Sequence, residues 1–212
     1  IICNNDNRYY INCTSSVKKM KPIVISGKIG SGKSTVCKLF EDHGYITISS
    51  DLMAKDLIRS NKTIRESLIK SFGADIIYKN KISSNKLRSI LCSSKENKEI
   101  IDAIVHPVFY KELNKVISCN NDKLAIEIPL VETCHQIDTD YILVYIEADE
   151  YIRKHRFLEK KEVDVNVFNN LDKLQKTKYL STIDQKYTIF NNGSLNDLED
   201  SFNKVYEELD NE

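Results

Sequence analysis

The stretch Ile23-Val24-Ile25-Ser26-Gly27-Lys28-Ile29-Gly30-Ser31-Gly32-Lys33-Ser34-Thr35 decides the fold. It opens with a short β-branched run, which predicts a fully buried strand. The pattern Gly-x-x-x-x-Gly-Lys-Ser follows at once and is typical of a P-loop, a strand-to-helix turn that cradles phosphate groups. Val36, Leu39 and Phe40 then recur at helical spacing, so the sequence also predicts the helix that this turn requires.

The residue types of this loop suit a phosphate group. Its glycines let backbone amides approach an anion with no Cβ in the way. Lys33 would bring a positive charge to the β- and γ-phosphates, and the Ser34 hydroxyl would bind Mg²⁺. The alternative is a glycine-rich turn that binds nothing, and the strand and helix around it argue against that alternative. We expect these residues to bind the nucleotide: Gly27, Gly30, Ser31, Gly32, Lys33, Ser34 and Thr35.

Length and charge limit the remaining possibilities. The 212 residues predict one domain, with room for a lid or a small inserted subdomain. The 31 basic and 31 acidic residues cancel, so no overall field favours nucleic acid or a membrane surface, and local charges must hold any anionic ligand. No apolar run approaches the ~20 residues needed to span a bilayer. The sequence does not indicate an oligomeric state.

The cysteines point to a reducing compartment. None of the six is spaced as Cys-x-x-Cys, which argues against a zinc site and a disulfide scaffold. We therefore expect a cytoplasmic protein with free thiols. Residues 1–19 show no helical or strand period and no secretory signal, so we expect a disordered leader or a non-native extension there. The domain itself is predicted to cover residues 20–212.

From Lys21 onward the pattern alternates between strands and helices. Five short apolar runs separated by helical patterns predict a parallel sheet covered by helices on both faces. The strands after the first are expected at Tyr45–Ile48, Leu124–Ile128, Tyr141–Ile146 and Tyr187–Phe190. Helices are expected at Thr35–His43, from Asp51, from Thr63 to Gly73, at Asn85–Cys92, Lys95–Val105 and Val108–Ser118, from Glu150, around Val167–Leu174, and at Leu195–Leu209.

Several residues predict where these helices begin and end. Gly44 and Gly73 suit the ends of two helices. Thr63 and Glu66 have the spacing of a capping box, in which each side chain bonds the other residue's amide. Pro107 is expected to separate two helices, because proline is favoured in a first helical turn.

Asp51 is a candidate catalytic carboxylate. It follows the second predicted strand by three residues and should lie near the carboxyl edge of the sheet, beside the P-loop. There it would accept the proton of an attacking hydroxyl or hold Mg²⁺ through water. The alternative is a helix N-cap, a common place for Asp after a strand.

A basic segment is a candidate for closing over the γ-phosphate. It contains Arg153, Arg156, Lys160 and Lys161, on a charged helix after the fourth predicted strand. Its alternative is a solvated helix face. A nucleotide switch or motor would also need a strand ending in Asp, and none is convincing here: Glu127 lies within the third predicted strand and Glu132 just past it.

Taken together, these segments resemble the dephospho-coenzyme A kinases. The resemblance runs from about Lys21 to Leu209. Beside the P-loop it rests on segments that keep the family's order: Ser50-Asp51, Phe72-Gly73, Ile104-Val105-His106-Pro107, Pro129-Leu130-Val131-Glu132 and Asn191-Asn192-Gly193-Ser194. The P-loop is common to many enzymes, whereas the ordered set is much more specific.

The resemblance implies an α/β fold: a P-loop kinase core with a helical acceptor-binding region and a lid at about residues 150–180. It implies transfer of the γ-phosphoryl group of ATP, with Mg²⁺, to the ribose 3′-hydroxyl of dephospho-coenzyme A. Asp51 would be the catalytic carboxylate and would contact the acceptor, and His106 would lie on the acceptor side. Lys33 and Arg156 would act on the transferred group, and Lys160 would bind the nucleotide from the lid.

Some positions depart from the family pattern. Ser49 and Ser84 stand where the family usually has Asp and Arg, Lys160 replaces a lid arginine, and Gln185-Lys186 replaces an Ala-Asp pair. Lysine cannot make arginine's bidentate contact with phosphate. Two alternatives therefore stay open: another P-loop nucleoside or nucleotide kinase, and a degenerate paralogue that binds nucleotide without turnover.

Overall fold

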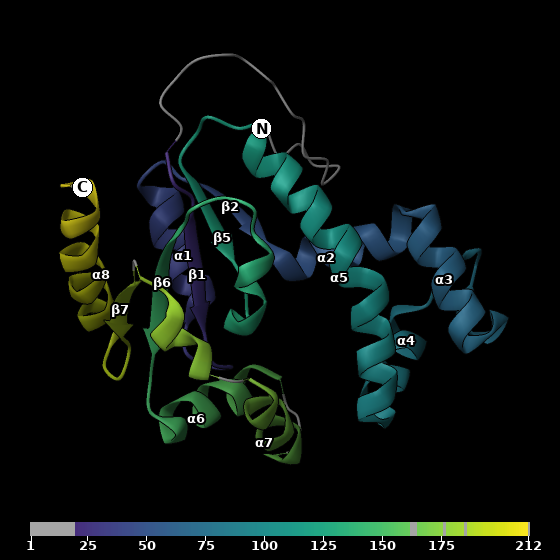
Figure 1. Cartoon of the computed structure of the whole chain (residues 1–212). Coiled ribbons are helices and arrows are strands. Elements are labelled where there is room, and N and C mark those ends of the chain that lie inside the picture. The colour runs from purple at the N-terminus through teal and green to yellow at the C-terminus, as the bar shows by residue number, and fades with distance from the viewer. Residues whose placement is uncertain (1–19, 162–164, 176, 185, 212) are drawn as a thin grey trace. The chain divides into compact units, whose positions relative to one another are not determined.

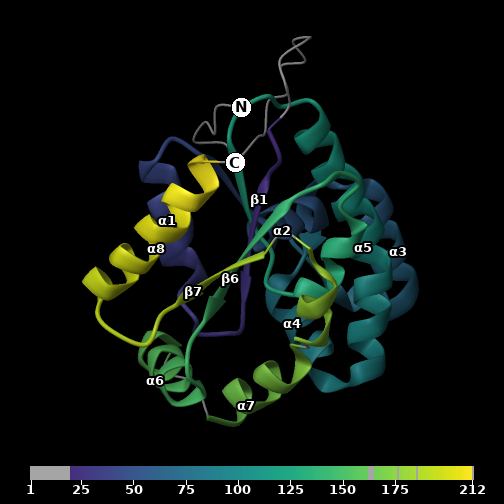
Figure 2. The same ribbon diagram turned by 60° about the vertical axis from the view of Figure 1, so that its left-hand side comes forward.

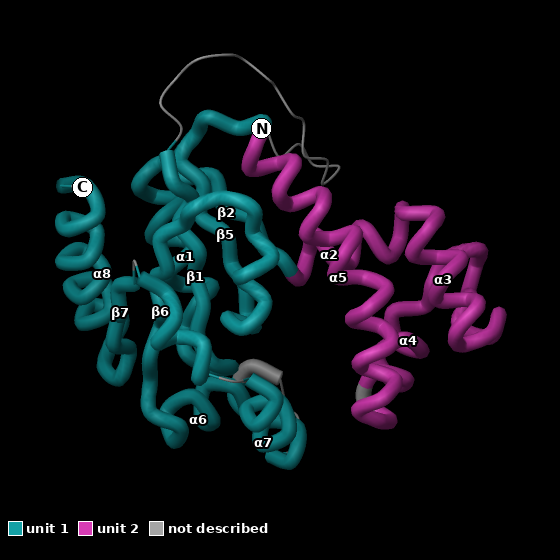
Figure 3. The backbone as a smooth tube through the Cα atoms, viewed as in Figure 1, with its two compact units in different colours: residues 1–50, 119–212 teal, residues 51–118 magenta. Residues whose placement is uncertain are grey.

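The computed structural model describes residues 20–161, 165–175, 177–184 and 186–211. The predicted leader at 1–19 lies outside the described residues. The chain divides into two compact units, shown in different colours in Figure 3. The first unit comprises the described parts of residues 1–50 and 119–212, and the second comprises 51–118.

The first unit is built on the predicted five-stranded parallel sheet. Its strands are β1 (Ile23–Gly27), β2 (Ile46–Ser49), β5 (Leu124–Glu127), β6 (Ile142–Glu147) and β7 (Lys186–Phe190). They lie side by side in the order β2-β5-β1-β6-β7, and every pairing is parallel. The strand that leads into the P-loop is therefore central, with a parallel neighbour on each side.

Two helices cover one face of this sheet. Figures 1 and 2 both show α1 (Lys33–Asp42) beside α8 (Leu195–Asp210). Alternate residues of β1 and β6 point toward them, as expected for strands. This core consists of Ile23, Ile25, Val36, Phe40, Ala125, Ile142, Val144, Ile146, Ile189, Leu198, Phe202 and Val205. Val24 and Leu143, which point to the opposite face, are fully buried too, so both faces are covered.

The remaining elements of the first unit follow the carboxyl ends of the strands. After β5 comes a 3₁₀ segment, η2 (Val131–Gln136). After β6 come α6 (Glu150–Lys161), α7 (Val165–Leu174) and a 3₁₀ segment, η3 (Lys178–Thr182). In parallel α/β sheets, ligands bind where the carboxyl ends of the strands meet.

The second unit is mainly helical. It contains α2 (Ser50–Ser60, with Ser50 in the first unit), α3 (Lys62–Phe72), a 3₁₀ segment η1 (Ala74–Ile76), α4 (Ser84–Ser93) and α5 (Lys95–Ser118). Its core consists of Ile64, Leu68, Ile76, Ile82, Leu87, Ile101 and Val105. This core is separate from the one beneath α1 and α8, so each unit has its own apolar interior.

Two of the predicted helix ends are confirmed. Gly44 follows α1 with φ +81°, and Gly73 ends α3 with φ +82°, both in the region that favours glycine. The predicted capping box is wrong. α3 begins earlier, and Asn61 is its N-cap, accepting a hydrogen bond from the amide of Ile64 at 3.1 Å. Asn and Thr both cap helices well, and the structure selects the residue nearer the end of α2.

The predicted break at Pro107 is also wrong. α5 is one helix of 24 residues with Pro107 inside it. Proline removes one helical hydrogen bond and is normally costly there. However, Ile101 and Val105 before it and Phe109 and Leu113 after it are all buried at a spacing of four residues. We attribute the continuity of the helix to this uninterrupted buried face.

The sequence analysis did not predict a small hairpin. β3 (Ile77–Tyr78) pairs antiparallel with β4 (Lys81–Ile82). Lys79 and Asn80 form its turn with φ values of +46° and +61°. Such values suit two-residue hairpin turns, but Lys-Asn lacks the glycine that usually indicates one.

Candidate active site

The P-loop occupies the turn between β1 and α1, where the sequence placed it. Two of its glycines have left-handed backbones, with φ +78° at Gly30 and +98° at Gly32. A Cβ on Gly30 would collide with the backbone oxygen of Arg153, and one on Gly32 would collide with the side-chain amide of Asn191. The loop is therefore packed against two other segments, and only glycine fits at these positions.

Lys33 and Ser34 lie at the start of α1, the positive end of that helix. The Lys33 ammonium folds over the loop and donates to the carbonyl oxygens of Gly27 at 2.8 Å and Lys28 at 3.1 Å. Ser34 is exposed in the first turn. A cation, a hydroxyl and a helix N-terminus thus converge at one place, the combination that favours an anion.

A cavity of about 490 Å³ opens beside the P-loop. Its volume is within the range of pockets that hold small ligands. The walls come from the P-loop and α1, from the end of β5, from α6, and from the β7–α8 connection. The lining residues are Ile29, Gly30, Gly32, Lys33, Ser34, Thr35, Glu127, Arg156, Phe157, Asn191, Gly193, Ser194, Leu195 and Leu198.

Glu127, which the sequence pattern did not single out as a site residue, is a further candidate. It was placed inside a strand, but it is the last residue of β5, in register with Ile25 of β1 and Ser49 of β2. It lines the cavity together with Ser34. The available signal was an apolar run that ends in a carboxylate two residues before Pro129, with Glu in the place of the expected Asp.

Arg156 belongs to the predicted basic segment and lines the cavity. Its guanidinium donates to the carbonyl oxygen of Asn191 at 2.8 Å, to Oδ1 of the same residue at 3.2 Å and to the carbonyl oxygen of Gly193 at 3.2 Å. Lys160 lies on α6, and its side chain is outside the described part of the structure, so its predicted role stays a prediction.

Asn191 has a structural role that the sequence did not reveal. It is only 5% exposed, its amide donates through Nδ2 to the carbonyl oxygen of Ser31 at 2.8 Å, and its backbone N–H donates to Glu147 at 2.8 Å. Through Asn191, the end of β7 connects Arg156 to the P-loop. The segment Asn191–Ser194 supported the family resemblance, but nothing in the sequence assigned a partner to it.

Asp51 is the second residue of α2 and is exposed. It follows Ser49, the last residue of β2, by two positions. Because the helix begins at Ser50, Asp51 lies within its first turn rather than before it, which does not fit an N-cap. Its catalytic role stays a prediction.

His106 lies on α5 in the second unit, half-buried. Its Nε2 is 3.6 Å from Oδ1 of Asp102, and that carboxylate is also 2.5 Å from Nζ of Lys98. Burial lowers the pKa of His106; the Asp102 charge opposes this shift, and the Lys98 charge adds to it. The neutral imidazole is therefore the favoured form in the folded chain.

This pKa shift predicts a dependence of stability on pH. A histidine whose pKa is lowered by folding costs stability once it is protonated, so its contribution is complete above its unfolded pKa of about 6.5 and is lost below it. Urea unfolding from pH 8 to 5 should show this loss in the parent and a smaller loss in His106→Asn. His155→Asn, at an exposed histidine, serves as the control. Equal losses in all three proteins would contradict the prediction.

Two further observations bear on metals and membranes. Within the described residues, no three His, Cys, Asp or Glu side chains gather as a metal site would require. Mg²⁺ commonly binds through one or two protein oxygens, with phosphate and water as its other ligands, and so does not need such a group. The described helices include none with the length and apolar character needed to cross a membrane.

The central strand, the P-loop and the cavity at the carboxyl edge of a parallel sheet define the chain as a P-loop kinase. Within that class, the model of the dephospho-CoA kinase family matches residues 22–197, and the chain belongs to this family. A dephospho-CoA kinase from Fusobacterium nucleatum is 34% identical over 189 residues, which cover 86% of this chain and 94% of that protein.

Solved structures agree with this fold. TT1252 from Thermus thermophilus superposes with a TM-score of 0.72 at 26% identity, covering 91% of this chain and 99% of the other. Dephospho-CoA kinase from Campylobacter jejuni gives 0.59 at 20% identity, covering 89% and 96%. Family membership supports ATP-dependent phosphorylation of dephospho-coenzyme A, and neither another nucleoside or nucleotide kinase nor a degenerate paralogue is favoured.

Proposed function

We propose that this chain transfers the γ-phosphoryl group of ATP to the ribose 3′-hydroxyl of dephospho-coenzyme A, with Mg²⁺, in the cytoplasm. The observation that carries this proposal is the cavity that brings Lys33, Ser34, Glu127 and Arg156 together at the P-loop. Within the described residues, Cys37, Cys119 and Cys134 form no disulfide bond, which suits a reducing compartment.

The P-loop side of the cavity would bind the phosphates. Backbone amides at the start of α1 would receive the anion, and Lys33 would exchange its bonds to the loop carbonyls for bonds to the β- and γ-phosphates. Arg156 would turn from Asn191 and Gly193 toward the transferred group. Phosphoryl transfer depends mainly on positioning and charge stabilisation, which these groups supply.

Ser34 and Glu127 would hold the magnesium ion. A hydroxyl and a carboxylate are oxygen ligands of the kind that Mg²⁺ prefers, and both line the same cavity. The bound ion would neutralise phosphate charge. Glu127 would act directly or through a water molecule, and the triphosphate would complete the site.

Asp51 and His106 would serve the acceptor. We propose that Asp51 orients the 3′-hydroxyl and accepts its proton, since it follows the carboxyl end of β2 by two residues and is exposed. His106, neutral at physiological pH, would offer a hydrogen bond to the acceptor rather than a charge.

A phosphoryl-transfer assay tests the proposal. Purified protein with ATP and Mg²⁺ is incubated with dephospho-coenzyme A, with adenosine, with AMP or with no acceptor, and ADP release and product mass are measured. We expect 3′-phosphorylated product from dephospho-coenzyme A alone. Transfer to adenosine or AMP instead would identify a nucleoside or nucleotide kinase. If no acceptor is phosphorylated but calorimetry shows that ADP binds, the chain is a degenerate paralogue.

We expect Arg156→Ala to lower kcat more than it weakens ATP binding. The three bonds that Arg156 makes to the β7–α8 connection are exchangeable, and its charge matters most when charge develops on the transferred phosphoryl group. Steady-state kinetics give kcat and calorimetry gives the Kd for ATP. Lys154→Ala, on the same helix, is the control. Equal losses in turnover and affinity would assign Arg156 to ground-state binding.

A further inference from the structure

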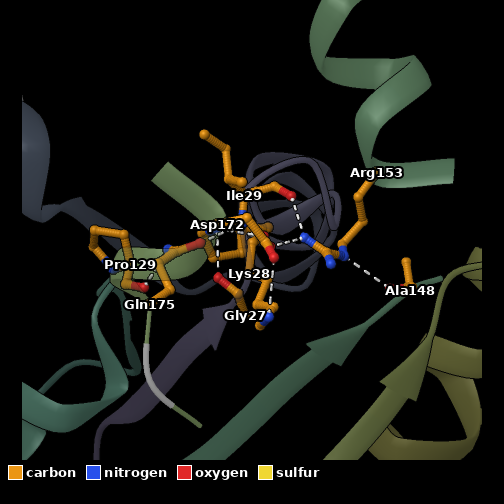
Figure 4. Close-up of polar contacts among 9 residues, drawn as sticks. Gly27, Lys28, Ile29, Pro129, Ala148, Arg153, Asp172 and Gln175 are labelled. Carbon is orange, nitrogen blue, oxygen red and sulfur yellow. Dashed lines mark hydrogen bonds and ion pairs between the residues drawn. The ribbon is translucent and has the colours of Figure 1, made fainter. Parts of the chain in front are cut away.

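Ile29, in the middle of the P-loop, is held through both of its backbone groups by distant side chains (Figure 4). Its amide donates to Oε1 of Gln175 at 2.6 Å, and its carbonyl oxygen accepts from Nη1 of Arg153 at 3.1 Å. Gln175 also donates through Nε2 to the carbonyl oxygen of Pro129 at 2.9 Å, which anchors it beyond the end of β5. The peptide groups around Ile29 are therefore oriented from outside the loop.

The sequence predicted that Arg153 belongs to a basic cluster that faces the phosphates, and this prediction is wrong. It is 4% exposed and does not line the cavity. Its Nε donates to the carbonyl oxygen of Ala148 at 2.9 Å, its Nη1 also lies 2.5 Å from Oδ1 of Asp172, and its guanidinium lies 5.7 Å from the ring centre of Phe168. A buried cation needs such partners, and here they bind it to the protein interior.

Asp172 of α7 joins Arg153 to a second cation. Its Oδ2 is 3.2 Å from Nζ of Lys28, a P-loop residue, and its side chain is 13% exposed. Burial tends to raise the pKa of Asp172, but hydrogen bonds and charges from Arg153 and Lys28 outweigh this effect and hold the pKa below its usual range. One charged carboxylate thus bridges α6 and the P-loop.

We propose that Arg153, Asp172 and Gln175 are positioning residues that hold Lys28–Gly30 in the shape that receives nucleotide phosphates, without touching the nucleotide themselves. Asn191 holds the next part of the loop through the carbonyl of Ser31. A loop that is already ordered loses less conformational entropy when a ligand binds. Because residues of α6 and α7 order this loop, we expect nucleotide affinity to depend on them. The inference rests on the proposed use of ATP.

The main test is Asp172→Asn, which keeps the side chain's shape but places an amide between two cations. We expect the Kd for ADP with Mg²⁺, measured by calorimetry well below the thermal midpoint, to rise about 10-fold. The KM for ATP should rise with it, while the KM for dephospho-coenzyme A should stay within about 2-fold. Asp172→Glu, which keeps the charge, should restore part of the affinity. Lys173→Ala, at an exposed neighbour on α7, is the matched control.

A second variant addresses the backbone contacts. Arg153→Lys keeps a positive charge near Asp172 but loses the planar fork that reaches Ala148, Ile29 and Asp172 together. We expect it to weaken ADP binding in the same direction. If both variants lower the thermal midpoint but leave the Kd for ADP unchanged, the cluster is only structural and the proposal is overturned.

The sign of the change excludes a competing explanation. If Asp172 merely withholds Lys28 from the phosphates, Asp172→Asn would release the ammonium and ADP would bind more tightly, which would overturn the proposal. ADP binding needs no acceptor, so the test separates this inference from the proposed reaction. The parent protein could phosphorylate no acceptor while its variants still bind ADP more weakly. That result would support the positioning role and reject the proposed reaction.

Discussion

Lys33→Ala should remove most of the turnover while leaving the chain folded. The ammonium of Lys33 folds over the P-loop at the mouth of the cavity, where the β- and γ-phosphates are proposed to bind. Loss of a charge-assisted contact in such a site typically removes about 2–4 kcal/mol of transition-state stabilisation, a fall in rate of roughly 30- to 10³-fold.

The fold should tolerate this change. Lys33 is partly exposed, and water can replace its bonds to the carbonyl oxygens of Gly27 and Lys28. Steady-state rates and a circular-dichroism melt of the same samples separate the two effects, with Lys38→Ala, at an exposed lysine of α1, as the control. Near-normal kinetics in Lys33→Ala would remove Lys33 from the mechanism.

The features that could be read from the sequence are those that neighbouring residues determine. The P-loop is recognisable because a buried strand, its glycines and Lys33-Ser34 stand within one short stretch. The order of the strands in the sheet depends on contacts between residues far apart in the sequence, so neighbouring residues do not determine it. The alternation of strand and helix still predicts parallel pairing, because each helical crossover brings the chain back to the end of the sheet at which the previous strand began.

The predictions of helix boundaries failed where more than one local arrangement satisfies the sequence rules. Asn61 and Thr63 both suit an N-cap, and the structure uses the first. Pro107 normally ends or begins a helix, but the buried face of α5 continues through it. At Asn61 and Thr63 the two N-caps are locally almost equivalent, whereas at Pro107 the buried face outweighs a local preference.

The residues around the P-loop could not be predicted, because their partners are far away in the sequence. Lys28 and Asp172 are separated by 144 positions, and Asn191 and Ser31 by 160. A charged helix such as α6 normally faces solvent, so Arg153 carried no sign of burial. Only the packing of α6 and α7 against the loop distinguishes Arg153, which positions the loop, from Arg156, which lines the cavity.

The proposed chemistry depends most on Asp51, and Asp51→Asn tests it. If Asp51 accepts the proton of the 3′-hydroxyl, the amide keeps the shape of the side chain but cannot act as a base. General-base assistance is typically worth roughly 10²–10⁴-fold, so kcat should fall by about that factor. Affinity for dephospho-coenzyme A should change far less, because an amide oxygen still accepts a hydrogen bond from the hydroxyl.

A purely structural role gives a different result. Asp51 lies in the first turn of α2, where its negative charge stabilises the helix by about 0.3–1 kcal/mol through the macrodipole. Losing only that contribution would lower the thermal midpoint slightly and leave the rate within a few-fold of the parent. Single-turnover phosphorylation of dephospho-coenzyme A at saturating ATP and Mg²⁺ distinguishes the two, with Asp56→Asn on the same helix as the control. Because Ser49 provides no second carboxylate at the end of β2, a fast Asp51→Asn variant would leave the reaction without its proposed base.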